Sequence, residues 1–245
     1  MRAFWKLTVT EFKLFVREPL AVFFILAFPL LLLWLNGSVF GNAPVPEQGG
    51  QGPVDLLVPG YVALVLATVG FTQLPGVLAT YRERGILRRL ATTPVAPAKV
   101  LGAQLVVQLV AGTIGVALLL AAATAFYDLS RPRAIGAAVL VYLAGALALY
   151  ALGFVLAALA PNARTASAAG FVVYFPMIFL SGAVIPRQNL SASMRRIGEV
   201  LPLAPVVTAL QDAWSGTGIS IVTLAALAAM VVVALAVGVR VFRWE

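Results

Sequence analysis

Residues 134–163 read AIGAAVLVYLAGALALYALGFVLAALAPNA, a run of 30 residues that contains no charged side chain. A helix needs about 20 mainly apolar residues to cross the hydrocarbon core of a bilayer. Five more uncharged runs of sufficient length lie at 19–46, 56–81, 100–127, 165–186 and 213–239. The sequence therefore predicts an all-α integral membrane protein with six transmembrane helices.

The composition agrees with this fold class. Hydrophobic residues make up 62% of the chain and charged residues 11%, whereas a soluble domain carries about 25% charged residues. The apolar runs are continuous rather than alternating, which argues against a transmembrane β-barrel. The connecting loops are too short for a separate soluble domain, so we expect residues 1–245 to form a single transmembrane domain.

The distribution of basic residues predicts the orientation. Twelve of the 17 Lys and Arg residues fall on the side of the membrane that holds both termini. Basic residues concentrate in cytoplasmic loops, so we expect a cell-membrane protein with both termini in the cytoplasm and with external loops at 36–55 and 128–133. The net charge of +8 then reflects contact with anionic lipid, and no nucleic-acid partner is expected.

The first 18 residues, MRAFWKLTVTEFKLFVRE, have a helical pattern of their own. At 100° per residue, Arg2, Lys6, Lys13 and Arg17 fall on one narrow arc, opposite an aromatic and aliphatic face. This arrangement predicts an amphipathic helix over 1–18 that lies in the membrane interface.

Two segments between the apolar runs are not expected to span. Within residues 81–99, charged residues recur four positions from charged residues, and apolar residues four positions from apolar ones. This spacing places the two kinds on different faces and predicts a short amphipathic helix that ends before Pro94. Residues 186–212 are broken by Pro186, Pro202 and Pro205 into pieces too short to cross. We expect this second segment to be re-entrant or interfacial, on the external side.

Several kinds of chemistry lack their residues. The chain has no His and no Cys, and it contains no G-x-x-x-x-G-K-[ST] loop for ATP. No metal site and no catalytic constellation is predicted, so we expect a transport subunit rather than an enzyme or a scaffold. No Asp or Glu lies in the middle of a predicted span, which argues against an ion-coupled secondary transporter.

The polar residues within the spans are mild and have two readings. Thr68, Thr72 and Gln73 lie in the second run, and Gln104 and Gln108 share one face of the third. They are either partners in hydrogen bonds between helices or the polar lining of a substrate path. The second reading makes Thr68, Thr72 and Gln73 candidate lining residues.

The segment that runs from Arg82 to Leu90, RERGILRRL, is followed by Thr93, Pro94 and Val95. It resembles the E-R-x-x-G-[TI]-L…L…T-P motif of the permease subunits of ABC-2 type ATP-binding cassette transporters, which include the daunorubicin-resistance exporters. The later Ser181-Gly182…Pro186 and Leu201-Pro202…Pro205 resemble the external region of the same family. The resemblance covers essentially the whole chain.

The resemblance implies a coupling helix at 82–91 that docks on an ATPase. Its docking residues would be Arg82, Glu83, Arg84, Gly85, Arg88, Arg89, Thr93 and Pro94. The helix at 1–18 would be the connecting helix, and Pro186, Pro202 and Pro205 would belong to an external gate. The chain itself would bind no cofactor, because ATP and Mg²⁺ would be held by two separate ATPase subunits.

The resemblance also implies a second permease, either an identical copy in a homodimer or a sister permease, with a path between spans one, two and five of the two. The expected function is ATP-driven export of a hydrophobic or amphipathic drug, antibiotic or lipid-like molecule, as in drug efflux and antibiotic resistance. Export of a glycan or other polymer on the same scaffold stays open as an alternative, and ion-coupled transport is a weaker one.

Overall fold

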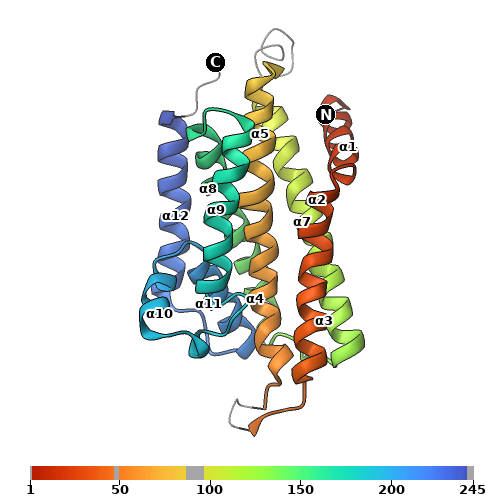
Figure 1. The fold of residues 1–245 in the computed structure, drawn as a ribbon, viewed down its shortest axis with the longest axis vertical. Coiled ribbons are helices and arrows are strands. Elements are labelled where there is room, and N and C mark those ends of the chain that lie inside the picture. The colour runs from red at the N-terminus through yellow and green to blue at the C-terminus, as the bar shows by residue number, and fades with distance from the viewer. Residues whose placement is uncertain (1, 47–49, 87–96, 242–245) are drawn as a thin grey trace.

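The computed structural model describes residues 2–46, 50–86 and 97–241, and all of the regular structure in these ranges is helical (Figure 1). In chain order its elements are α1 (Arg2–Val16), α2 (Pro19–Val22), η1 (Phe23–Ala27), α3 (Phe28–Phe40), α4 (Pro53–Ala67), η3 (Thr68–Gln73), α5 (Leu74–Glu83), α7 (Pro97–Tyr127), α8 (Ile135–Leu159), α9 (Ala163–Leu180), η4 (Arg187–Asn189), α10 (Ala192–Glu199), α11 (Leu203–Ser215) and α12 (Ile221–Val241). The elements η1 and η3 are π-helical, and η4 is a short 3₁₀ helix.

Five of the predicted spans are confirmed as helices long and apolar enough to cross a membrane. They are Pro19–Phe40, Pro53–Glu83, Gly102–Tyr127, Ile135–Leu159 and Ala163–Leu180. The predicted sixth run, 213–239, is divided in the structure because Gly216 adopts a left-handed conformation and ends α11. Its span corresponds to α12, a helix of 21 residues whose described apolar part covers Ile221–Ala234.

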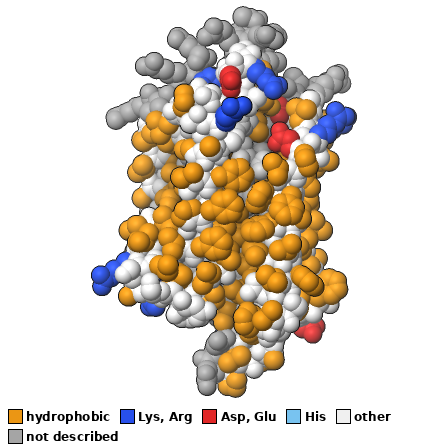
Figure 2. All heavy atoms as spheres, viewed as in Figure 1, with side chains coloured by type: hydrophobic (Ala, Val, Ile, Leu, Met, Phe, Trp, Pro, Cys, Tyr) orange, Lys and Arg blue, Asp and Glu red, His pale blue; other side chains and the backbone are white. Residues whose placement is uncertain are grey.

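The two ends of the molecule differ in what they contain. The N- and C-termini lie at the same end, and α10 and α11 lie toward the opposite end (Figure 1). Figure 2 shows hydrophobic side chains across the middle of one face, with the charged side chains gathered at its two ends. Termini at the same end mean that the chain crosses the apolar middle an even number of times, as a chain with six spans would.

The second span, α4–η3–α5, is the central helix of the molecule. In its most apolar stretch 94% of the residues are buried, against 33% in the first span, α2–η1–α3. It packs against α3 and α7, against α8 and α9, and against α11. The second span is therefore the element on which the other helices pack.

Each of the first two spans contains a π-helical segment followed closely by a proline. Pro29 follows η1 and Pro75 follows η3. A proline cannot donate to the carbonyl four residues earlier, and its ring crowds that carbonyl, so a wider turn relieves the clash. The sequence pattern did not reveal these segments, because one added residue hardly changes a helical period in a uniformly apolar run.

The carbonyls displaced in this way face glycines on neighbouring helices. Phe71, four residues before Pro75, directs its carbonyl at Gly170 on α9, where a Cβ would collide with the oxygen. Ile25, four residues before Pro29, has its carbonyl 2.8 Å from the position that a Cβ on Gly115 of α7 would take. Small residues at these positions let the helices approach closely.

The helix expected at 1–18 is present as α1 and packs on α7. Its apolar face is divided: Phe15 is buried and Phe12 half-buried, with their ring centroids 6.2 Å apart, whereas Trp5 is exposed. Two of the aromatic residues therefore pack on the protein, and Trp5 is free to contact lipid.

Candidate functional site

The end of α5 carries the first residues of the predicted docking segment. Gly85, with φ +63°, turns the chain directly after the helix, and its N–H donates to Arg82 O at 3.0 Å. A left-handed residue just after a helix is a common terminator, and glycine adopts this conformation without strain. Arg82 and Glu83, the first residues of the helix predicted at 82–91, therefore belong to the last turn of the span, and residues 87–91 lie outside the described residues.

The other predicted docking residues are placed as follows. Arg84 is exposed directly beyond the helix end. Arg88, Arg89, Thr93 and Pro94 lie outside the described residues. Their docking role stays a prediction.

Arg82 and Glu83 are both bonded to the turn between α8 and α9. The Arg82 guanidinium donates to Ala157 O at 3.1 Å, to Ala158 O at 3.2 Å and to Ala160 O. Carbonyls at a helix C-terminus lack partners within the helix and attract cations. One Glu83 carboxylate oxygen accepts from Ala163 N, at the start of α9, at 3.1 Å.

These two residues form what we call the Arg82–Glu83 clamp. The Arg82 guanidinium donates to carbonyls at the C-terminal end of α8, and the Glu83 carboxylate accepts from an N–H at the start of α9. The end of α5 is therefore hydrogen-bonded directly to both helices of the α8–α9 turn. Sequence reasoning found both residues but not these partners, because the contacts join positions almost 80 residues apart.

The N-terminal helix also reaches the end of α5. The Glu11 carboxylate is half-buried and accepts a hydrogen bond from Tyr81. Burial raises the pKa of the Glu11 carboxyl, and the hydrogen bond from Tyr81 opposes this shift. α1, α5 and the α8–α9 turn are therefore tied together at the end of the molecule that holds the termini.

The candidate lining residues lie in the interior of the chain's helical bundle. Thr68 is buried, and its hydroxyl lies 2.9 Å from the Tyr174 hydroxyl of α9 and donates to Leu64 O. Thr72 donates to Thr68 O at 2.7 Å, and Gln73 Nε2 donates to Thr72 Oγ1 at 3.1 Å. These contacts match the reading of hydrogen bonds within and between helices, and a lining role stays a prediction.

Gln104 and Gln108 are buried on α7. Among the described residues, the Oε1 atom of each has no hydrogen-bond partner. An orphaned buried amide oxygen is costly in a membrane interior, so these two atoms are the least satisfied polar groups of the third span.

The three prolines of the predicted external region each lie at or near a helix start. Pro186 precedes η4, Pro202 precedes α11, and Pro205 lies in the first turn of α11. At these positions the missing N–H is not needed for a helical hydrogen bond. The broken character predicted for 186–212 is confirmed, and a gating role stays a prediction.

Arg187 links the two ends of this broken segment. It donates from Nε to Ser181 O at 3.1 Å, just after α9, and from Nη2 to Ala204 O at 3.3 Å, in α11. Burial lowers the pKa of its guanidinium, and the charge of Glu199 opposes the shift. Sequence reasoning did not single out this arginine.

Sequence reasoning also missed the role of Asp55 at the start of α4. Its carboxylate accepts from Ser130 N at 2.8 Å, Ser130 Oγ at 3.0 Å, Gly52 N at 3.2 Å and Asn42 Nδ2 at 3.2 Å. One signal was available, since an acid three residues after Gly52 is at the N3 position of a capping box. A local sequence pattern could not identify its partners in the α7–α8 loop, because they lie far away in the sequence.

The architecture defines a polytopic helical membrane protein whose charged groups lie at the ends of its spans. The family model of the ABC-2 type transporter matches residues 2–214. The chain therefore belongs to the ABC-2 type transporter family and is a permease subunit of an ABC transporter, a transport component that is not itself catalytic. Membership implies association with ABC ATPase partners. No curated protein matches the chain.

Proposed function

We propose that this permease exports a hydrophobic or amphipathic drug, antibiotic or lipid-like molecule, as part of a complex of two permease copies and two ATPase subunits. Both termini would lie in the cytoplasm of a cell with this complex in its plasma membrane. The observation that supports the proposal best is the position of the charges. In the second span Asp55 starts the helix and Arg82 and Glu83 end it, with none between.

A charge-free interior leaves the chain without a site for proton or Na⁺ coupling, so the free energy has to come from a partner. The Arg82–Glu83 clamp supports a route for it. An ATPase that moves the segment after Gly85 would pull on α5, and through the clamp on α8 and α9. ATP and Mg²⁺ would be bound by the ATPase, and this chain would hold neither.

Reconstitution in liposomes tests the proposal. The permease is reconstituted with and without its cognate ATPase, and ATP-dependent accumulation is measured over a panel of amphipathic dyes, lipid analogues and oligosaccharides. We expect accumulation of amphipathic compounds only when both subunits and ATP are present. Transport of oligosaccharides alone would favour the polymer-exporter alternative, and accumulation driven by protons or Na⁺ without the ATPase would overturn the proposal.

Orientation is tested separately by single-cysteine labelling, which suits a chain without cysteine. Ser38 is exposed near the end of α3. We expect Ser38→Cys to react with an impermeant maleimide from outside intact cells. Labelling only from the cytoplasmic side would reverse the proposed topology.

A further inference from the structure

The short helix α10 has an apolar face that no other part of the chain covers. At about 100° per residue, Met194, Ile197 and Val200, the residue that ends the helix, fall within an arc of about 120°. Their exposed fractions are 48%, 53% and 82%. We call these three residues the apolar face of α10.

The opposite side of α10 is charged. Arg195, Arg196 and Glu199 lie on it, and all three are exposed. Arg195 donates from Nη2 to Leu190 O at 3.3 Å, whereas Arg196 has no hydrogen bond among the described residues. A short helix with exposed apolar side chains on one side and arginines on the other suits the boundary between lipid and water.

The contact of α10 with the rest of the chain uses neither face. The helix packs on α9 and α11, and its buried residue is Gly198, where a Cβ would collide with Leu180 O at the end of α9. By contrast, α11 is enclosed in the bundle, since most of its residues are buried. Within the segment 186–212, α10 is therefore the helix that is free to contact the surroundings.

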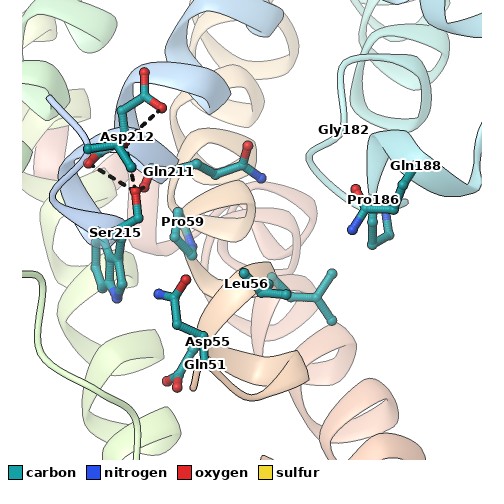
Figure 3. Close-up of a pocket in the computed structure, with 13 residues that line it drawn as sticks. Gln51, Asp55, Leu56, Pro59, Gly182, Pro186, Gln188, Gln211, Asp212 and Ser215 are labelled. Atoms are coloured by element: carbon teal, nitrogen blue, oxygen red, sulfur yellow. Dashed lines mark hydrogen bonds between the residues drawn. The ribbon is translucent and has the colours of Figure 1, made fainter. Parts of the chain in front are cut away.

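The interior cavity next to this segment does not receive the apolar face either. It has a volume of about 270 Å³ and lies between the start of α4, the C-terminal half of α11 and residues 182–188, which lead from α9 toward α10 (Figure 3). No residue of α10 lines this cavity. The apolar face is thus directed away from the bundle and needs an occupant from outside the chain.

The depth of α10 in the molecule identifies that occupant. Along the long axis, α10 lies at the height of α3, whose exposed side chains include Leu31, Trp34 and Leu35 (Figure 1). The helix on which α10 packs also exposes apolar side chains up to its last turn, where Phe179 is exposed. The apolar face of α10 therefore continues a surface that faces lipid.

We propose that α10 lies in the membrane interface at this end of the molecule and binds phospholipid. Its apolar face contacts the upper part of the acyl chains, and Arg196 extends to the lipid phosphates. The proposed orientation decides only which leaflet this is: with both termini in the cytoplasm, it is the external one. Because Gly198 packs on Leu180, α10 joins the end of α9 to that leaflet.

Fluorescence quenching of a single labelled cysteine tests the contact in this cysteine-free chain. Ile197→Cys carries a nitrobenzoxadiazole label, and Glu199→Cys, on the charged side, is the matched control. The full chain is placed in phosphatidylcholine nanodiscs. Two quenchers are used: a phosphatidylcholine with a nitroxide near the top of its acyl chain, and aqueous iodide.

The lipid nitroxide should quench the label at position 197 at least about threefold more than the label at position 199, because an interfacial helix buries its apolar side below the headgroups. Iodide should quench the two positions in the reverse order. Met194→Cys supplies a second labelled position on the apolar face and should behave like Ile197→Cys.

Arg196→Glu tests the phosphate contact. With the label at position 197, this change should reduce quenching by the lipid nitroxide about twofold, because a carboxylate is repelled by phosphate. Arg131→Glu is the matched control: Arg131 is exposed in the α7–α8 loop, and its replacement should leave the quenching unchanged. Equal effects of the two changes, or no effect of Arg196→Glu, would overturn the phosphate contact.

Two results would overturn the interfacial position itself. Equal quenching of positions 197 and 199 by iodide would place α10 in water. Protection of position 197 from both quenchers would show that a second copy of the chain covers the apolar face. Nanodiscs expose both leaflets and the measurement needs no nucleotide, so failure of the proposed export or orientation would leave its outcome intact.

Discussion

The first and second spans share one local feature but differ in what surrounds it. Each has a π-helical segment before a proline, and each directs a carbonyl at a glycine of a neighbouring helix, Gly115 for the first span and Gly170 for the second. The apolar stretch of the second span is 94% buried, and that of the first is 33% buried. The same backbone irregularity is therefore enclosed in one span and mostly peripheral in the other.

The helices around a local irregularity determine how much a misfit beside it destabilises the protein. A misfit next to η3 has helices on several sides, and close-packed interiors transmit strain rather than absorb it. A misfit next to η1 has fewer helices of the chain around it, so the first span can shift away from α7 to relieve it. The second span is also hydrogen-bonded to neighbouring segments at both ends, through Asp55 at its start and through the Arg82–Glu83 clamp at its end.

Gly170→Ala should have the largest effect on stability. The added methyl would collide with Phe71 O, a backbone atom that cannot rotate away. We expect a loss of about 3 kcal/mol, at the upper end for overpacking, measured as the change in unfolding free energy in mixed micelles. Gly136→Ala is the control, because Gly136 is exposed in α8 with open space around it, and it should be neutral or stabilising. Equal tolerance of the two changes would contradict the packing argument.

Gly115→Ala repeats the experiment on the first span. A Cβ here would lie 2.8 Å from Ile25 O, so the contact is also too close. Because the first span is freer to move, we expect a smaller loss of about 1.5 kcal/mol in the same assay. A loss as large as that of Gly170→Ala would contradict the claim that the first span relieves overpacking more easily than the second.

Arg82→Ala tests the clamp at the end of the second span. The change removes three hydrogen bonds to the α8 C-terminus. Since the site is partly exposed, water replaces much of the loss, and we expect about 1 kcal/mol of destabilisation. Arg82→Lys should recover part of it, because an ammonium group still reaches a carbonyl. No recovery by lysine would indicate that the fork geometry matters more than the charge.

Glu83→Arg separates docking from stability. Glu83 is exposed and its hydrogen bond to Ala163 N is at the surface, so unfolding should change by less than about 0.5 kcal/mol. If this end docks an ATPase as we propose, the yield of the purified complex or its coupled transport should fall. Glu83→Gln keeps the acceptor for Ala163 N without the charge and shows which of the two matters. Normal complex yield and normal transport by Glu83→Arg would remove Glu83 from the docking surface.

The sequence predicted most of the fold because a bilayer imposes simple rules. Five of the six uncharged runs matched spans since a buried charge is costly, whereas the sixth is divided at Gly216. Pro186 and Pro202 correctly marked the broken segment since proline favours helix starts. The contacts of Asp55 and Arg187 were not predictable. They join distant segments, and no local period carries that information. The docking role predicted for residues beyond Gly85 rests on the resemblance and stays a prediction.

Glu11→Gln should have the smallest effect, and the effect should depend on pH. Glu11 belongs to α1, which precedes the first span, yet it bonds to Tyr81 at the end of the second. Burial raises its pKa above the usual 4.5. A carboxyl whose pKa is higher in the folded state stabilises that state fully below its unfolded pKa, and this contribution is lost as the pH rises through the folded value.

Glutamine keeps an acceptor for Tyr81 and cannot ionise. The variant should therefore unfold at a slightly higher temperature than the natural chain at neutral pH, and the difference should shrink to nothing below pH 4.5. Thermal unfolding of both proteins across this range checks the sign. A variant that unfolds at a lower temperature than the natural chain at neutral pH would mean that the ionised carboxylate stabilises the contact, and that α1 is joined to the second span by charge rather than by a neutral hydrogen bond.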